Sequence, residues 1–462
     1  MEQQHKRSAF SGKIGFVLSA AGASVGLGNI WRFPAVTQAN GGAAFLLLYI
    51  GCVALLGIPV MLAEFSLGRA GQSDAIGAFR RLAPGKVWWL TGALGIFASY
   101  IITCFYIVVE GWTLEYLWQS ITGDLFAGVG RLEAGGDFAG ADAAFLAKMN
   151  EYISTPVAPV AFTWLVILLN LGVLVGGVQK GIERLSNVLL PLLFVLLVAL
   201  CCVTLTLPGA GEGVEWFLRP DFSVITPATV INALGQTFFS LSLGMGILIT
   251  YSAYYPANTR LTPTATIVAL MSLLVALLTG FVIFPSVSSF GLTDHSLAGA
   301  TLVFQTLPEV FACLPAPQLW SAMFFLLLFV AALTSTVSLL EVTIAFCRER
   351  FGLSRFKACL ATILPLPLLS MVCSLSFSTL ADFKIFGLTI FDFLDTFATN
   401  IILPIVSIAV CVFIGWFAPR GLLRRELTNN GTIRSHLSGI VMFIIRYLAP
   451  VMIALILIYT FI

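Results

Sequence analysis

The stretch AAGASVGLGNIWRFP, residues 20–34, lies in the first long apolar segment and sets Gly26 and Gly28 beside Ser24 and Asn29. Two glycines flanked by polar side chains, in a segment long enough to cross a bilayer, indicate a transmembrane helix that is interrupted midway. The alternative interpretation is that the bare glycines allow a neighbouring helix to pack closely.

A second apolar segment repeats this pattern. The sequence FFSLSLGMGIL, residues 238–248, sets Gly244 and Gly246 beside Ser240 and Ser242. Matched breaks in two spans favour a binding site over simple packing, because unwinding exposes carbonyls that hold a cation and amides that hold a carboxylate.

The bulk composition places most of the chain in lipid. Apolar residues make up 59% of the 462 residues and charged residues only 10%, whereas soluble domains carry about 25% charged residues. About eleven apolar segments have the length of roughly 20 residues that a membrane crossing requires. They fall near 14–38, 43–68, 89–120, 158–177, 187–207, 227–253, 265–290, 318–346, 356–375, 387–417 and 439–461.

We therefore expect an all-α polytopic membrane protein of about eleven transmembrane helices. The two broken helices are the first and the sixth. The chain crosses the membrane five times before the sixth span begins, so the sixth span starts on the side opposite to the first. This predicts an inverted five-plus-five repeat. The expected divisions are an N-terminal tail at 1–13, a first repeat at 14–207 with an outside loop at 123–157, a second repeat at 208–417 with an outer lid at 294–316, and a loop with the eleventh span at 418–462.

Basic residues predict the orientation. They gather in the tail and in alternate loops, as at Arg80, Arg81, Arg424 and Arg425, which predicts a cytoplasmic N-terminus and, for eleven spans, an outside C-terminus. We expect a multi-pass protein of the inner (plasma) membrane, with the bilayer as its surroundings, no nucleic-acid partner and no obligate protein partner. The first segment is too long for a cleaved signal peptide, and nothing in the cysteine or histidine spacing indicates an enzyme.

Charged residues inside apolar spans are costly and are functional candidates. They are Arg32, Glu64, Glu110, Glu341, Asp392 and Asp395. We expect Arg32 and Asp395 to pair as an outer gate and Arg7 and Glu349 as an inner gate. The alternatives are that the outer pair snorkels separately into headgroups and that the inner pair is merely solvated.

A hydroxyl-rich run, AALTSTVS at 331–338, sets Thr334, Ser335 and Thr336 in the eighth span. Their oxygens suit a small hard cation, although hydroxyls in membrane helices often bond to their own helix.

Six motifs, taken in order, resemble those of the neurotransmitter:sodium symporter family. They are GLGNIWRFP at 26–34, NGG at 40–42, GIPVMLAEFSLGR at 57–69, GQTFFSLSLGMG at 235–246, AALTS at 331–335 and FDFLDTFATN at 391–400. The resemblance covers about residues 7–417, and the eleven-span length is similar to that of the family's bacterial amino-acid transporters.

The resemblance implies sodium as the coupling ion, with one or two bound. The second sodium site would use Gly22, Val25, Ala331, Thr334 and Ser335. The first would use Ser24, Asn29, Ser240 and Ser272, together with the substrate carboxylate. Ser272 stands where the family usually has asparagine, so coupling to a single sodium remains open.

The resemblance also implies the substrate pocket. Its members would be Ala23, Leu27, Gly28, Ile102, Tyr106, Phe239, Ser242, Met245, Ser335, Thr336 and Leu339. Tyr106 would hydrogen-bond the carboxylate of a small amino-acid substrate, and the apolar members would take a large neutral side chain. Gly26 replaces the aspartate of amine-transporting relatives.

Chloride is expected to have little or no role. By the resemblance, the positions that match the family's chloride site are Tyr49, Gln236, Ser240, Ser272 and Ala276. Ala276 supplies no hydroxyl to that set.

The function expected from residues and resemblance together is sodium-coupled symport that imports a neutral amino acid, large and hydrophobic or aromatic, by alternating access. The alternatives are an ion channel, which would need a continuous polar pore, and a sodium-coupled transporter of another small carboxylate-bearing solute.

Overall fold

The computed structural model describes residues 13–129, 139–290, 302–434 and 437–459. Within these ranges the regular structure is helical, and the one β contact is an isolated bridge between Ile385 and Leu388. The predicted all-α class is confirmed.

Nine helices in the described ranges are long and apolar enough to cross a membrane. Together with the interrupted first and sixth spans they make the eleven predicted. The nine are α3–η2–α4 (Ala43–Cys52, Val53–Gly57, Ile58–Gly71), α6 (Trp89–Thr122), α8 (Val157–Val175), η4–α9 (Val178–Glu183, Arg184–Thr204), α13 (Leu261–Ser289), α15 (Pro317–Phe351), α16–α17 (Arg355–Ile363, Leu366–Leu375), α18–η7–α19–η8 (Ile390–Thr396, Phe397–Ile402, Leu403–Val412, Phe413–Phe417) and α21–η9–α22 (Ser438–Phe443, Ile444–Leu448, Ala449–Tyr459).

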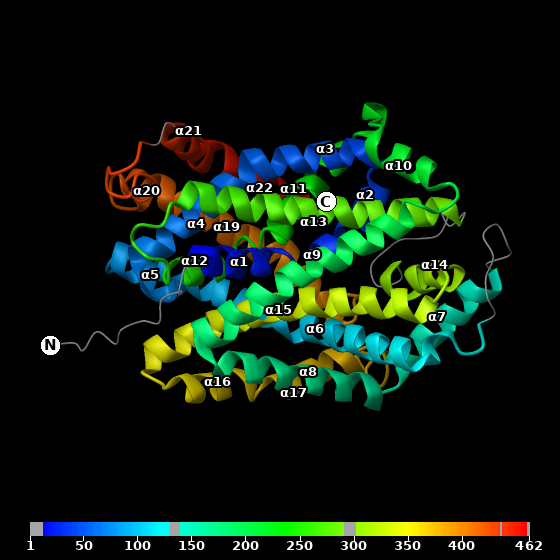
Figure 1. Ribbon diagram of the computed structural model, residues 1–462. Coiled ribbons are helices and arrows are strands. Elements are labelled where there is room, and N and C mark those ends of the chain that lie inside the picture. The colour runs from blue at the N-terminus through cyan, green and yellow to red at the C-terminus, as the bar shows by residue number, and fades with distance from the viewer. Residues whose placement is uncertain (1–12, 130–138, 291–301, 435–436, 460–462) are drawn as a thin grey trace.

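The first and sixth spans are broken where the glycines predicted. The first consists of α1 (Lys13–Ser24), η1 (Gly28–Arg32) and α2 (Phe33–Ala39), and the sixth of α11 (Pro227–Ser240) and α12 (Ile247–Ser252). In the sixth span, positive φ angles at Ser242, Gly244 and Gly246 end the helical path, and glycine adopts such angles without steric cost. Figure 1 shows α1 to α2 running left to right and α11 to α12 running right to left.

Shorter elements join the spans at the two ends of the bundle. They are α5 (Ala75–Leu82), η3 (Asp124–Phe126), α7 (Ala139–Ser154), α10 (Ala210–Leu218), η5 (Phe222–Val224), η6 (Leu302–Thr306), α14 (Leu307–Cys313) and α20 (Leu422–Leu427). Residues 302–313 of the predicted lid are thus helical, while its residues 294–301 lie outside the described ranges.

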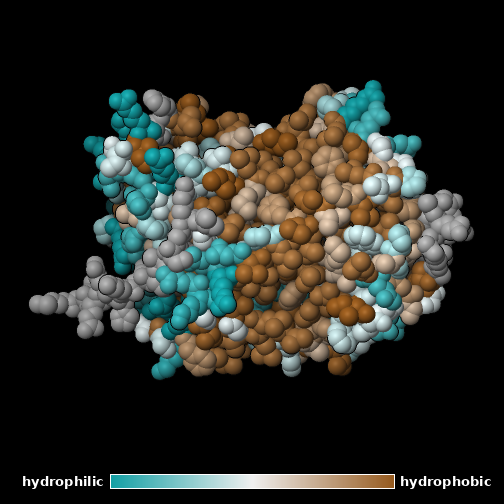
Figure 2. Space-filling model, in the orientation of Figure 1, coloured by the Kyte–Doolittle hydropathy of each residue, from teal (hydrophilic) through white to brown (hydrophobic). Residues whose placement is uncertain are grey.

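On the face shown in Figure 2, apolar residues cover the middle of the bundle and polar residues gather toward both ends. This pattern is the one that a bilayer imposes on a polytopic protein. The broken spans lie inside the bundle. Ala20, Ala21 and Val25 of the first span and Leu241 and Leu243 of the sixth are fully buried, so the exposed backbone at each break faces protein rather than lipid, as it must.

Candidate functional site

The open end of α1 forms the centre of the site. The last carbonyls of a helix have no partner within it, and here two other spans and the second half of the first span supply donors to them. The Ser335 hydroxyl donates to Gly22 O at 3.4 Å, the Ser242 hydroxyl to Ala23 O at 2.8 Å and the Asn29 amide to Ser24 O at 3.0 Å. The break therefore holds several carbonyl oxygens at one depth, which is what cation binding requires.

The chain beyond the break is held from two further directions. The Leu27 N–H donates to the Tyr106 hydroxyl at 3.1 Å, and the Gln236 amide donates to Gly28 O at 2.9 Å. Tyr106 comes from α6 and Gln236 from α11, so the third and sixth spans both hydrogen-bond to the segment Leu27–Gly28.

Four residues predicted for the first sodium site come together beside this segment. The hydroxyls of Ser240 and Ser272 lie 2.8 Å apart, Ser240 donates to Asn29 Oδ1 at 2.5 Å, and the Asn29 amide nitrogen donates to Ser272 at 3.1 Å. Ser272 also lies 3.4 Å from Ser24 O. The oxygen set fits a small cation.

The hydroxyl of Tyr49 extends this cluster from the second span. It lies 2.7 Å from the Ser240 hydroxyl, and both residues are buried. Ala276, the remaining member of the predicted chloride set, is also buried and adds no polar atom.

The second predicted sodium site lies between α1 and α15. Ser335 reaches Gly22 O, and a methyl group added at Gly22 would lie 3.5 Å from Thr334 Cβ. The Thr334 hydroxyl meanwhile lies 3.0 Å from Ala331 O of its own helix. Two hydroxyls and the carbonyls of Gly22 and Ala331 thus share one interface, and they are hard oxygen donors that suit sodium. Val25 is fully buried at the end of α1.

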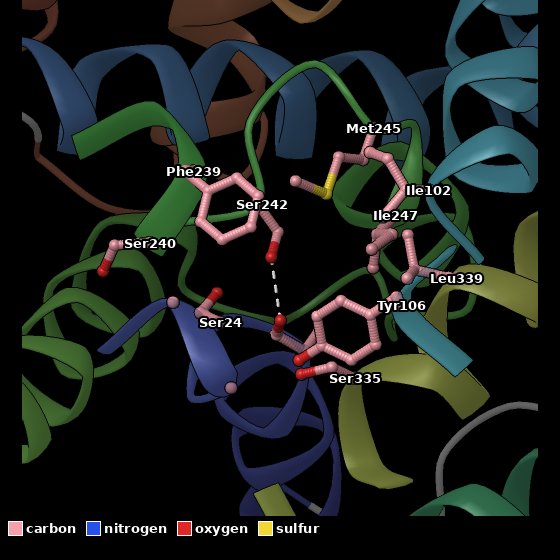
Figure 3. Close-up of a pocket in the computed structure, with 13 residues that line it drawn as sticks. Ser24, Ile102, Tyr106, Phe239, Ser240, Ser242, Met245, Ile247, Ser335 and Leu339 are labelled. Carbon is pink, nitrogen blue, oxygen red and sulfur yellow. Dashed lines mark hydrogen bonds between the residues drawn. The ribbon is translucent and has the colours of Figure 1, made fainter. Parts of the chain in front are cut away.

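A small central cavity of about 30 Å³ lies between the two breaks (Figure 3). Its lining residues are Ala23, Ser24, Gly26, Gly28, Ile102, Tyr106, Phe239, Ser240, Ser242, Met245, Ile247, Ser335 and Leu339. Figure 3 shows Ile102, Met245, Ile247 and Leu339 clustered on one side, away from the hydroxyls of Ser24 and Ser240. The cavity therefore has a polar side and an apolar side.

Two residues of the predicted pocket do not line the central cavity. Leu27 contributes its N–H to Tyr106, and the Thr336 hydroxyl points to Glu110 instead. Four lining residues are absent from the predicted pocket: Ser24, Gly26, Ser240 and Ile247. Ser24 and Ser240 are predicted only as members of the ion sites. Ile247 directly follows the second glycine pair, and this position was the available signal.

Phe239 separates the central cavity from a second one. Its ring lines both cavities and would lie 2.7 Å from a methyl group at Gly28. The Arg32 guanidinium lies over the same ring, 4.9 Å from its centroid. Asp395 acts on Arg32 electrostatically, but no ion pair within 4.0 Å joins these two described residues.

Of the predicted inner gate, only Glu349 falls in the described ranges, because Arg7 lies outside them. Glu349 accepts from the Ser73 hydroxyl at 2.7 Å and from the Asp74 N–H at 2.9 Å. It therefore ties the end of α15 to the start of α5.

The other charged residues of the spans have specific partners. Glu64 accepts from the Gly244 N–H at 2.7 Å, so a second-span carboxylate supports the break in span six. Glu341 pairs with Arg355 at 2.7 Å. Asp392 lies at the start of α18, where Thr389 contacts it at 2.6 Å, and a carboxylate is favourable there.

Comparison with known proteins gives one answer throughout. The family model described as "Sodium:neurotransmitter symporter family" matches residues 7–128 and 145–462. An uncharacterized sodium-dependent transporter of Bacillus subtilis is 36% identical over 98% of this chain and 97% of its own length. A sodium-dependent transporter of Methanocaldococcus jannaschii is 33% identical over 94% and 88%. The crystal structure of MhsT in complex with L-phenylalanine matches with a TM-score of 0.88 and 39% identity, covering 98% of this chain and 100% of that one.

Proposed function

The chain belongs to the sodium:neurotransmitter symporter family, and from that premise we propose that it imports a large neutral amino acid together with sodium by alternating access. The family is one of transporters, and the homologues are sodium-dependent, so a membrane transporter rather than an enzyme is the starting point. The substrate, the number of ions and the orientation in the membrane belong to the proposal.

The observation that carries the proposal is the two-sided central cavity. Its polar side offers the Tyr106 hydroxyl and the backbone of the first break, which suit the carboxylate and ammonium of an amino acid. Its other side offers Ile102, Met245 and Leu339 to an apolar side chain. Met245 adapts its shape easily, which favours aliphatic and aromatic side chains alike. The likeness to a transporter solved with L-phenylalanine supports this choice.

Sodium would be held on both sides of the break. The main ligands of the second site would be Gly22, Thr334 and Ser335. Those of the first site would be Asn29, Ser240 and Ser272, and the substrate carboxylate would complete its coordination. A bound sodium would supply positive charge that attracts the substrate carboxylate.

Alternating access would require a gate on each of the two paths that lead from the cavity to the two sides of the membrane. Phe239, covered by Arg32 beside Asp395, would close one path, and Glu349 with Ser73 the other. The two five-helix repeats, 14–207 and 208–417, would move against each other around the breaks. In this proposal Arg80 and Arg81 of α5, together with Arg424 and Arg425 of α20, would lie at the cytoplasmic end by the positive-inside rule. The N-terminus would then be cytoplasmic and the C-terminus outside.

A binding panel tests the proposal. The purified protein in detergent is mixed with each of the twenty amino acids, and its thermal stability is measured in sodium chloride and in potassium chloride. We expect large neutral amino acids to raise the melting temperature in sodium only, since a ligand stabilises the state that binds it. A shift caused by small or charged solutes alone, or equal shifts in potassium, would contradict the proposal.

A further inference from the structure

A carboxyl group that the proposed transport cycle does not use lies next to the ligand-bearing turn of α15. Glu110 is on α6, one helical turn beyond Tyr106, and 0% of its surface is exposed. Among the described residues, no Lys, Arg or His forms an ion pair with it. An ionised carboxylate buried without a cation is strongly unfavourable.

The hydrogen bonds around Glu110 allow a proton count. The Thr336 hydroxyl lies 2.6 Å from Glu110 Oε2 and 3.0 Å from Ala332 O. A carboxylate and a carbonyl both accept, yet a hydroxyl has a single proton to donate. Each contact is a full two-centre hydrogen bond when Glu110 carries a proton and donates it to Thr336, which then donates to Ala332 O; an ionised Glu110 would leave the two acceptors sharing one proton.

The other oxygen of Glu110 is satisfied by a third helix. The Asn170 amide of α8 donates to Glu110 Oε1 at 3.3 Å and to Val166 O at 3.0 Å. Glu110 can therefore accept from α8 and donate to α15 at the same time, so it joins three spans.

Three consecutive hydroxyls of α15 point in three directions. Thr334 turns to its own helix, Ser335 to Gly22 of α1 and Thr336 to Glu110 of α6. Successive helical residues are about 100° apart, so fixing Thr336 also fixes the direction of Ser335. The Thr336–Glu110 contact and the Ser335–Gly22 contact therefore constrain the same rotation of α15.

We propose that Glu110 is a neutral, hydrogen-donating positioning residue that fixes the rotation of α15 and so orients Ser335 for sodium. This inference rests on the proposed function, because it concerns sodium binding at the second region. It requires the proton of Glu110 and not a negative charge, and the amide of glutamine should therefore replace it.

The test measures sodium-driven amino-acid uptake in proteoliposomes for Glu110→Gln, Glu110→Leu and Thr336→Val. Thr103→Val is the matched control, since the Thr103 hydroxyl is equally buried on α6 but bonds only to Ser99 O, at 2.8 Å. We expect Glu110→Gln and Thr103→Val to keep the wild-type sodium concentration for half-maximal uptake. Glu110→Leu and Thr336→Val should raise it about tenfold, with a smaller change in maximal rate.

Each outcome decides the proposal. If Glu110→Gln is as impaired as Glu110→Leu, a charge is needed and the inference is wrong; if Glu110→Leu matches wild type, Glu110 has no positioning role. If Glu110→Leu does not fold, Thr336→Val serves as the test. An unchanged sodium dependence in Thr336→Val would also overturn the inference. Absence of sodium-driven uptake in the wild type would instead contradict the proposed function itself.

Discussion

The two candidate sodium regions flank the same break in the first span but are built from different atoms. The first is a closed cluster of side chains in which Asn29, Ser240 and Ser272 bond to one another. The second combines main-chain oxygens, such as Gly22 O, with the adjacent hydroxyls of Thr334 and Ser335. A substitution leaves a main-chain oxygen in place but can remove a side-chain oxygen. Sodium binding at the first region is therefore more easily weakened by substitution.

Removal of both hydroxyls of the second region should have the largest effect. Thr334→Ala combined with Ser335→Ala deletes two hard oxygens, which costs about 3 kcal/mol or more and raises the sodium requirement at least about 100-fold. The measurement is uptake against sodium concentration. The control is Thr279→Val, whose buried hydroxyl bonds its own helix at 2.8 Å. An unchanged sodium requirement in the double variant would remove the second region from the account.

A methyl group placed between the two regions should be nearly as damaging. In Gly26→Ala the new carbon would lie 2.4 Å from the Ser335 hydroxyl and 2.9 Å from the Tyr106 hydroxyl. Overpacking of this kind costs about 1–3 kcal/mol, and we expect amino-acid affinity in a binding assay to fall by about tenfold or more.

The matched control for that change is Gly51→Ala in the second span, where an added methyl meets nothing within 4 Å. Equal affinities of the two alanine variants would show that the space beside Gly26 is not part of the binding site.

Weakening the first region should have a smaller effect. Ser272→Ala removes one hydroxyl but leaves Asn29 and Ser240 bonded to each other, so the sodium requirement should rise about tenfold or less. The Hill slope for sodium should then be close to one. Ser286→Ala on the same helix is the control, since its buried hydroxyl bonds Val282 O at 2.6 Å. A slope near two in Ser272→Ala would show that the first region does not depend on this residue.

Replacement of chloride by gluconate should have the smallest effect. Ala276 contributes no polar atom beside Tyr49, Gln236 and Ser240, so we expect the rate of uptake at fixed sodium to stay unchanged. Loss of uptake in gluconate would show that the cluster holds an anion after all.

Much of the fold followed from physical limits that a bilayer imposes on any sequence. Each crossing needs about 20 apolar residues, and the breaks at Gly26 and Gly244 could be predicted because glycines there had polar neighbours. Tyr106, Phe239 and Met245, which the family resemblance implies as pocket residues, line the central cavity; their binding of substrate stays a prediction.

Side-chain direction was the part that the sequence could not supply. Thr336 belongs to the same hydroxyl-rich run, 331–338, as Ser335, yet its position on the helix turns it to Glu110. Glu64 was recognisable as a charge in a span, but its bond to Gly244 depends on how spans two and six meet. Such contacts arise from the relative rotation of helices, which a single sequence does not encode locally.

The most direct test of the central claim, sodium-coupled import of a large neutral amino acid, is uptake of labelled phenylalanine into proteoliposomes under an inward sodium gradient. The account predicts transient accumulation above the equilibrium level, which a sodium ionophore abolishes. Accumulation that is the same with and without the gradient, for phenylalanine and for the other large neutral amino acids, would contradict it.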